Sequence, residues 1–368
     1  MNILDAEPLF FTSVYKERIW GGSSLASVLN KKIPSGKLIG ESWEICGFGS
    51  DQSVVEQGPL SGKTLGDLFK DLRPDLVNNY PSSTFPLLIK YLDASDNLSV
   101  QIHPDGEYAR LHGMGNCGKT ECWYVLDAAE DAQLILGFKR EVTFDDVRYA
   151  IKNDSLHHLL NFVNVRPGEV YYIPAGTVHA ILGGNLICEI QEPSDTTLRL
   201  YDWGRVDGNG NCRELHIEHS VQTADLTPHN YRIEPVALNH GTYQHSYRIA
   251  CRHFTMEEYF LTRTTSLHLP PKEYVRILTA LDGTLTMHYP AGNRQLQKGQ
   301  TVLLPSVLER VDISGDDSAR FLCISVPDLQ KDIINPLLRY GIPPSVIKEL
   351  GGFEERNDLL SLLYPPVN

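Results

Sequence analysis

The chain has 368 residues, a hydrophobic content of 42% and a formal net charge of −13. This length and composition predict a globular protein with one large core or two smaller ones, not a fibre or a disordered chain. The negative charge and the lack of Lys/Arg runs argue against nucleic acid as a partner, and no apolar stretch reaches the roughly 20 residues of a membrane helix.

The first seven residues contain neither a positively charged stretch nor an apolar one, so they do not read as a secretory signal. The seven cysteines are odd in number and none lie in a C-x-x-C pair, which favours reduced thiols over a disulfide framework. Both features lead us to expect a cytoplasmic protein.

Short runs rich in Val, Ile, Tyr and Phe recur between clusters of Gly, Pro, Asn and Asp, as at 170–173 and 186–190. This pattern predicts a mainly β fold, a barrel or a sandwich. Helical patterns are few, and those at 64–72 and 143–151 each begin at a Thr that can cap a helix. We expect them to be accessory helices packed on a sheet.

The strand-like segment 98–104 carries Gln101 and His103 two residues apart, so both side chains share one face. Glu121 begins a later strand-like run, and His179 follows a Pro-x-Gly turn. These four side chains suit a divalent metal of the zinc kind, held in an open site and used as a Lewis acid. Either histidine alone is equally an ordinary polar residue at a strand end, but the convergence of four ligand types favours a metal site.

The segment 113–120 matches both the P-loop pattern and the G-x-G-x-x-G pattern. A phosphate-binding loop needs a buried strand before it and a helix after it. Here the preceding residues 108–112 are polar and helix-like, whereas the following residues 122–125 read as a strand. We therefore expect no nucleotide site.

An internal repeat relates 168–179 to 299–310, because in both copies a Gly is followed by five residues and a Pro. The second copy has Arg310 where the first has His179, and no Gln-x-His pair precedes it. We expect two barrels: a metal-binding catalytic domain with accessory helices over 1–240, and a degenerate domain without metal over 241–326. Apolar residues at helical spacing predict a helical extension over 327–368 that packs on a barrel or makes a subunit contact.

The polar segment 195–205 contains two arginines, Arg199 and Arg205, that are candidates for binding an anionic substrate. For Arg205 a surface ion pair with a neighbour such as Asp202 is an equal alternative.

With these residues assembled, the chain resembles the type I phosphomannose isomerases, zinc-dependent enzymes of the cupin superfamily, in their short bacterial form. The resemblance is carried by segments in a fixed order, with weaker similarity at 20–22 and 40–44: 86–94, 98–105, 118–127, 170–179 and 189–205. It implies two cupin-type jelly-roll barrels and an aldose–ketose isomerase that interconverts mannose 6-phosphate and fructose 6-phosphate.

The resemblance also implies roles for individual residues. One zinc ion per chain is held by Gln101, His103, Glu121 and His179. Arg199 is the catalytic arginine; Lys90, Lys119, Ser99 and Arg205 line the sugar-phosphate pocket; Glu189 and Asp195 stand where the family carries acidic site residues. Gly118 stands where some members have a His, so a proton-shuttling role for that His does not carry over.

In the mechanism we hypothesise, a proton moves between C1 and C2 of the sugar through an enediol, and a carboxylate takes it. Glu189 is the first candidate for this base because it lies on the strand before Arg199 and partial burial would raise its pKa; Asp195 is the next. Lys119 shares a strand face with Glu121 and so contacts the substrate, or else forms a salt bridge at the pocket rim.

Three other functions stay open. One is an isomerase for another sugar phosphate. A second is a cupin oxygenase using Fe(II), against which the glutamine ligand and the nearby Lys/Arg argue. A third is a sugar-phosphate-binding cupin without turnover, against which Arg199 and Lys119 argue. The sequence is compatible with a monomer or a homodimer.

Overall fold

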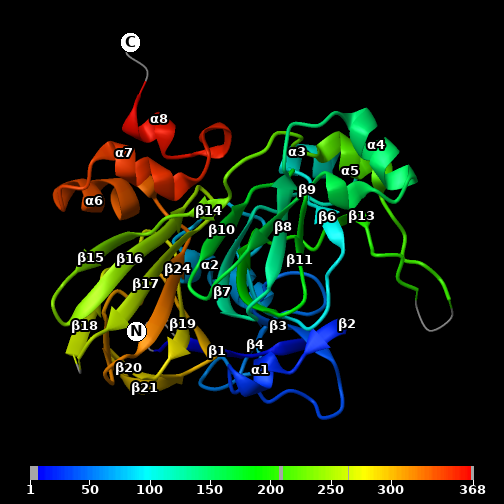
Figure 1. The fold of residues 1–368 in the computed structure, drawn as a ribbon. Coiled ribbons are helices and arrows are strands. Elements are labelled where there is room, and N and C mark those ends of the chain that lie inside the picture. The colour runs from blue at the N-terminus through cyan, green and yellow to red at the C-terminus, as the bar shows by residue number, and fades with distance from the viewer. Residues whose placement is uncertain (1–6, 207–209, 264, 366–368) are drawn as a thin grey trace.

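The structure is a computed structural model that describes residues 7–206, 210–263 and 265–365. Its strands form four antiparallel sheets, two in each half of the molecule, and its helices lie outside them (Figure 1). The predicted fold class, mainly β with two jelly-roll barrels and few helices, is confirmed.

The first half of the fold contains a seven-stranded sheet and a five-stranded sheet. The seven-stranded sheet has the order β14 (Arg232–Ile233), β10 (Val170–Ile173), β7 (Glu121–Ala128), β12 (Asn185–Gln191), β5 (Leu88–Ala94), β2 (Val14–Gly22) and β3 (Ile39–Ile45). The five-stranded sheet has the order β13 (Leu198–Tyr201), β6 (Val100–Ile102), β11 (His179–Ile181), β8 (Gln133–Phe138) and β9 (Leu160–Asn164).

The second half contains an eight-stranded sheet and a four-stranded sheet. The larger has the order β15 (Val236–Asn239), β16 (Tyr243–Ala250), β17 (Thr255–Leu261), β24 (Arg320–Ser325), β19 (Arg276–Asp282), β22 (Thr301–Leu304), β1 (Leu9–Thr12) and β4 (Val54–Val55). The smaller has the order β18 (Thr265–Leu269), β23 (Val311–Gly315), β20 (Thr284–Tyr289) and β21 (Gly292–Gln297). Two N-terminal strands, β1 and β4, thus belong to the sheet of the second half; the division at residue 240 stays a prediction.

Strands β5, β7 and β12 are buried on both faces because the two large sheets share a core. Along β5, Ile89 and Tyr91 join that core, which also contains Ile249 and Leu322 of the second half, whereas Leu92 packs inside the first barrel. This is the alternation of a strand with two different neighbours. The same alternation sends the following residues of β7 and β12 to the shared core: Cys122, Tyr124, Cys188 and Ile190.

The two helices expected from the sequence begin where predicted. Helix α2 (Leu65–Val77) is capped by Thr64, whose side chain accepts the Asp67 N–H, and α4 (Phe144–Lys152) is capped by Thr143 in a reciprocal capping box. The other helices before residue 327 are short: α1 (Ser24–Ser27), α3 (Gly106–Leu111), the 3-10 turn η1 (Leu156–His158) and α5 (Ile217–Thr223).

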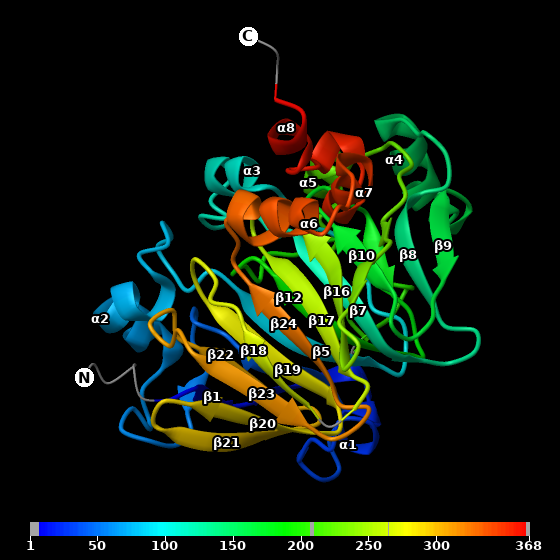
Figure 2. The same ribbon diagram turned by 90° about the vertical axis from the view of Figure 1, so that its left-hand side faces the viewer.

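The C-terminal residues form a chain of short helices that lie across one end of the strands (Figures 1 and 2). They are the π-helical η2 (Gln330–Ile334), α6 (Asn335–Arg339), α7 (Pro344–Ile347), the 3-10 turns η3 (Lys348–Gly351) and η4 (Glu354–Arg356), and α8 (Leu360–Leu363). Ile333, Ile347 and Leu350 are buried in the core that the two halves share. The extension therefore packs on the rest of the chain.

The repeat and the phosphate-loop pattern are both explained by local geometry. Gly168 and Gly299 adopt positive φ values of 87° and 79°, and each turns the chain into an equivalent strand, β10 or β22. The segment 113–120 follows helix α3 and precedes strand β7, the reverse of a phosphate-binding loop.

All seven cysteines are free, and no helix in the described part of the chain is long and apolar enough to cross a membrane.

Candidate metal centre and active site

Three predicted metal ligands meet in the interior of the first barrel. Glu121 begins β7, His103 follows β6 and His179 begins β11, and all three side chains are buried. Their candidate ligand atoms lie within 4.8 Å of one another. His103 Nε2 is 3.3 Å from Glu121 Oε1, and His179 Nε2 is 3.8 Å from Glu121 Oε2. Strands of the seven-stranded and the five-stranded sheet thus bring three candidate ligands close together.

Backbone contacts fix the orientation of both imidazoles. His103 Nδ1 lies 2.9 Å from the Thr196 carbonyl oxygen, and His179 Nδ1 lies 2.8 Å from the Thr177 carbonyl oxygen. A carbonyl can only accept a hydrogen bond, so each Nδ1 carries the proton and each Nε2 keeps its lone pair, which at His103 lies 3.1 Å from Lys119 Nζ. Both histidines present that lone pair toward Glu121.

The donor set fits a divalent metal. Glu121 Oε2 and His179 Nε2 are buried and have no hydrogen-bond partner within the described residues, which is the condition a bound cation would relieve. Gln101 pairs with His179 in the β6–β11 register and lines the adjoining pocket. Lys119 Nζ lies 2.8 Å from Glu121 Oε1 and 3.1 Å from His103 Nε2, so its ammonium would have to move aside for an ion held by those atoms.

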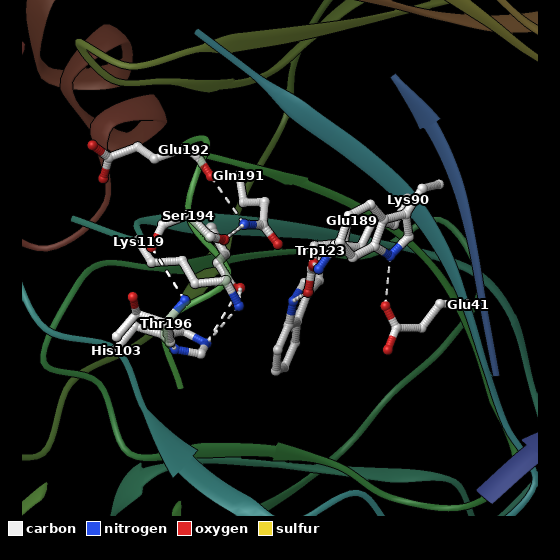
Figure 3. A network of polar contacts seen from close by, with 12 residues as sticks. Glu41, Lys90, His103, Lys119, Trp123, Glu189, Gln191, Glu192, Ser194 and Thr196 are labelled. Atoms are coloured by element: carbon white, nitrogen blue, oxygen red, sulfur yellow. Dashed lines mark hydrogen bonds and ion pairs between the residues drawn. The ribbon is translucent and has the colours of Figure 1, made fainter. Parts of the chain in front are cut away.

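A second buried group of charges continues along the seven-stranded sheet. Trp43, Lys90, Glu189 and Trp123 are register partners on β3, β5, β12 and β7, so their side chains share the inner face. Lys90 Nζ lies 3.0 Å from Glu189 Oε1, and Trp123 Nε1 donates to Glu189 Oε2 at 3.2 Å. Trp43 Nε1 donates to Glu41 Oε2 at 2.7 Å, and Lys90 Nζ lies 5.3 Å from the centre of the Trp43 ring. Figure 3 shows Lys90, Glu189, Trp123 and Glu41 together.

The environment shifts the pKa values of the two central carboxylates, Glu189 and Glu121, in opposite directions. Burial and the neighbouring Glu121 raise the pKa of Glu189. Burial alone would also raise the pKa of Glu121, but the Lys119 ammonium holds it well below its ordinary value. Glu121 is therefore the permanent anion of the pair, and Glu189 is the one that exchanges a proton more readily.

A pocket of about 360 Å³ opens beside this group. Its lining includes Ser99, Lys90, Gln101, Lys119, Glu189, Asp195 and Arg199, all of which the sequence analysis singled out. His103, Glu121 and His179 lie behind that wall, and the first two are in contact with Lys119. The predicted residues are thus brought together, with one exception.

The exception is Arg205, which is not among the residues that line the pocket. Its guanidinium donates to the Asn97 carbonyl oxygen and to Asp202 Oδ1, both at 2.5 Å. Arg213 lines the pocket instead, and its Nε donates to Asp202 Oδ2 at 2.7 Å. Asp202 therefore hydrogen-bonds to two arginines, while the acceptor of the Arg199 guanidinium within the described residues is the Glu214 carbonyl oxygen. The substrate role of Arg205 stays a prediction.

Seven lining residues were not among the site residues predicted from the sequence: Arg18, Trp20, Glu41, Leu92, Leu98, Thr197 and Arg213. The first three come from strands β2 and β3, which pair beside β5 although residues 14–22 and 39–45 lie far before it in the chain. Arg18 Nε donates to Glu41 Oε1 at 2.7 Å. The weak similarity at 20–22 and 40–44 was the available signal for this wall.

Comparison with known proteins yields one family. The model for the catalytic domain of type I phosphomannose isomerase matches residues 9–131. Mannose-6-phosphate isomerase ManA of Bacillus subtilis is 37% identical over 319 residues, which cover 85% of this chain and 97% of that protein. The probable mannose-6-phosphate isomerase GmuF of the same organism is 44% identical over 222 residues, 60% of this chain and 69% of that protein.

Solved structures agree with this match. The crystal structure of the mannose 6-phosphate isomerase from Bacillus subtilis superposes with a TM-score of 0.81 at 31% identity, and the match covers 86% of this chain and 99% of that one. A putative mannosephosphate isomerase from Archaeoglobus fulgidus shares the fold at 19% identity, with a TM-score of 0.68.

The state of the histidines predicts how metal binding depends on pH. Burial and the Lys119 ammonium lower the pKa of His103 to about 3, and burial also lowers that of His179. His103 is then neutral from pH 5.5 to 7, and the lowered pKa of His179 reduces the share of its protonated form. We expect the dissociation constant for Zn²⁺, measured by equilibrium dialysis, to change by less than about tenfold over this range. Two histidines with ordinary pKa values would weaken binding on the order of 50- to 100-fold at pH 5.5, and such a loss would contradict this description.

Proposed function

The chain belongs to the type I phosphomannose isomerase family, and from this premise we propose that it interconverts mannose 6-phosphate and fructose 6-phosphate with one zinc ion. The observation that carries the proposal is the buried group of His103, Glu121 and His179 beside a pocket lined by both cationic and acidic side chains. Such a pocket suits a polar, anionic sugar, and the carboxylates and ammonium groups suit proton transfer.

We propose that Gln101, His103, Glu121 and His179 hold the zinc ion. Two imidazoles, a carboxylate and an amide oxygen are donors of the kind that zinc accepts in open sites. When bound, the ion supplies Lewis-acid stabilisation of the negative charge that develops on the sugar oxygens. In this proposal the first barrel, residues 1–240, is catalytic. The second, residues 241–326, carries no metal site, and the candidate metal group in the described residues lies in the first.

Glu189 is the proposed base that moves the proton between C1 and C2. Its carboxylate is buried and lines the pocket, and its raised pKa brings its proton affinity toward that of a working acid–base group. Lys90 at 3.0 Å and Trp123 hold that carboxylate in place. Lys119 and Arg199 face the same pocket and are placed to donate hydrogen bonds to the sugar oxygens as charge builds on them.

The phosphate group is assigned to the arginine end of the pocket. Lys90, Lys119 and Arg18 each have a carboxylate of their own, in Glu189, Glu121 and Glu41 respectively. Arg205 and Arg213 share Asp202 as their hydrogen-bonded carboxylate, whereas the Arg199 guanidinium donates to the Glu214 carbonyl oxygen. That excess of positive charge suits a dianion, and a guanidinium binds phosphate with two hydrogen bonds.

The sugar phosphate is the proposed small-molecule partner, and a monomer or a homodimer is compatible with the proposal. The free cysteines support a cytoplasmic location.

The direct test is turnover of mannose 6-phosphate followed as fructose 6-phosphate, before and after chelator treatment and with Zn²⁺ added back. We expect activity that the chelator abolishes and Zn²⁺ restores. A zinc-loaded protein without turnover would defeat the assignment for this substrate. Turnover of a different sugar phosphate, or calorimetric binding without product, would then identify a related isomerase or a binding protein.

The assignment of the base is tested by Glu189→Gln, which keeps the shape of the side chain and removes its proton affinity. We expect kcat to fall about 10²- to 10⁴-fold, the usual contribution of a general base. Glu169→Gln is the matched control, because Glu169 also accepts hydrogen bonds, from Tyr171 and Arg166, outside the pocket. Wild-type kcat in Glu189→Gln would move the role to Asp195.

The phosphate end is tested by Arg213→Gln. We expect KM for mannose 6-phosphate to rise about 10- to 100-fold, the value of charge-assisted hydrogen bonds, while kcat stays within about threefold. Arg148→Gln removes a similar ion pair, with Glu218 at 2.8 Å, on the surface and serves as the control. An unchanged KM would exclude Arg213 as a phosphate ligand.

A further inference from the structure

Glu192 forms two hydrogen bonds with the backbone of Thr120. Thr120 lies between Lys119 and Glu121, whose side chains both reach the candidate metal centre. One Glu192 Oε accepts the Thr120 N–H at 2.8 Å, and the Glu192 N–H donates to the Thr120 carbonyl oxygen at 3.1 Å. These two bonds lie one residue beyond the last register pair of β7 and β12, Glu121 with Gln191. The backbone between Lys119 and Glu121 is thus fixed by a side chain.

Glu192 is in turn supported by the second half of the fold. Its side chain is 11% exposed, and the other Oε lies 3.3 Å from His253 Nδ1. His253 belongs to the β16–β17 hairpin turn, which is closed by the Cys251 N–H to the Phe254 carbonyl at 3.0 Å. Contacts therefore run without a break from the second barrel to the strand that begins with Glu121.

The C-terminal extension anchors the same turn. Arg252, next to His253, donates from its backbone N–H and from Nε to Asp358, at 2.8 and 2.6 Å. Thr120, Glu192, His253 and Asp358 all line a cavity of about 610 Å³. Beside that cavity, the two hydrogen bonds to Glu192 contribute to holding the Thr120 backbone in place.

The loop after Glu192 also contacts His103, one of the candidate metal ligands. Gln191 Nε2 donates to the carbonyl oxygens of Glu192 at 2.9 Å and Ser194 at 2.6 Å, which shapes this loop. Two residues further on, the Thr196 carbonyl oxygen accepts a hydrogen bond from His103 Nδ1 at 2.9 Å (Figure 3). One short segment that begins at Glu192 therefore contacts both His103 and Thr120, the residue between Lys119 and Glu121.

We propose that Glu192 is a positioning residue of the isomerase site: its carboxylate, supported by His253 of the second barrel, fixes Thr120 and so orients Lys119 and Glu121. This gives the second barrel, which has no candidate metal site among its described residues, a role in the site of the first. The role in turnover rests on the proposed function, whereas the role in metal binding is measured without substrate.

The test compares Glu192→Ala with Glu192→Gln. Alanine removes the acceptor of the Thr120 N–H, whereas the glutamine Oε1 retains it. Residues that orient metal ligands commonly contribute about 10- to 100-fold to metal affinity, so we expect Glu192→Ala to raise the Zn²⁺ dissociation constant by that factor. We expect Glu192→Gln to stay within about threefold of wild type, and kcat at saturating Zn²⁺ to follow the same order.

Glu169→Ala is the matched control, because Glu169 also accepts a backbone N–H, that of Arg166 at 2.9 Å, away from the site. We expect this variant to bind Zn²⁺ like wild type. An unchanged dissociation constant in Glu192→Ala overturns the proposal, and so does a glutamine variant as weak as the alanine variant, because the charge would then matter and not the acceptor.

His253→Ala tests the support from the second barrel, and carries the test if Glu192→Ala does not fold. The His253 side chain is 31% exposed at a turn, so its loss leaves the core intact. We expect a rise in the Zn²⁺ dissociation constant of more than about threefold, below that of Glu192→Ala. Wild-type affinity in His253→Ala would overturn the role of the second barrel. Zinc binding without turnover in the wild type would defeat the proposed function alone.

Discussion

The site depends on strands β5, β7 and β12 being buried on both faces. Because side chains alternate along a strand, the outward residues, such as Tyr91 and Cys188, form the core shared by the two barrels. The inward residues Lys90, Glu121 and Glu189 are then committed to the interior of the first barrel. A shift of one residue in register would send the charges into the shared core, so the apolar packing between the barrels also fixes the position of the active-site side chains.

Burying so many charges is possible because each carboxylate has a cation beside it. Glu121 contacts Lys119, Glu189 contacts Lys90, and Glu41 contacts Arg18. Unpaired ions would be very costly in such an interior, whereas paired ones act strongly on one another there. Burial lowers the pKa of both histidines, to about 3 for His103, which favours their neutral forms. A metal ion would therefore add positive charge where Glu121 already concentrates negative charge.

Local patterns in the sequence predicted much of this arrangement, and distant strand pairing explains what they missed. The Gln-x-His pair, Glu121 and His179 were recognisable because each stands at a strand end or turn with its own signature. Arg18 and Glu41 were missed, since nothing near them in the sequence shows that β2 and β3 flank β5. Nor did the sequence show that Arg213, and not Arg205, lines the pocket, because both approach Asp202 and only the folded chain separates them.

We propose that strands of two facing sheets bring four ligands to one metal ion. The most direct test of this proposal is a crystal structure of the zinc-loaded protein with anomalous diffraction measured at the zinc absorption edge. We predict one peak per chain at about 2.0–2.2 Å from the Nε2 atoms of His103 and His179 and from a Glu121 oxygen, with Gln101 completing the set. The Lys119 ammonium would be displaced from its present contacts. A peak elsewhere, or one without either histidine within bonding distance, would contradict the proposed ligand set.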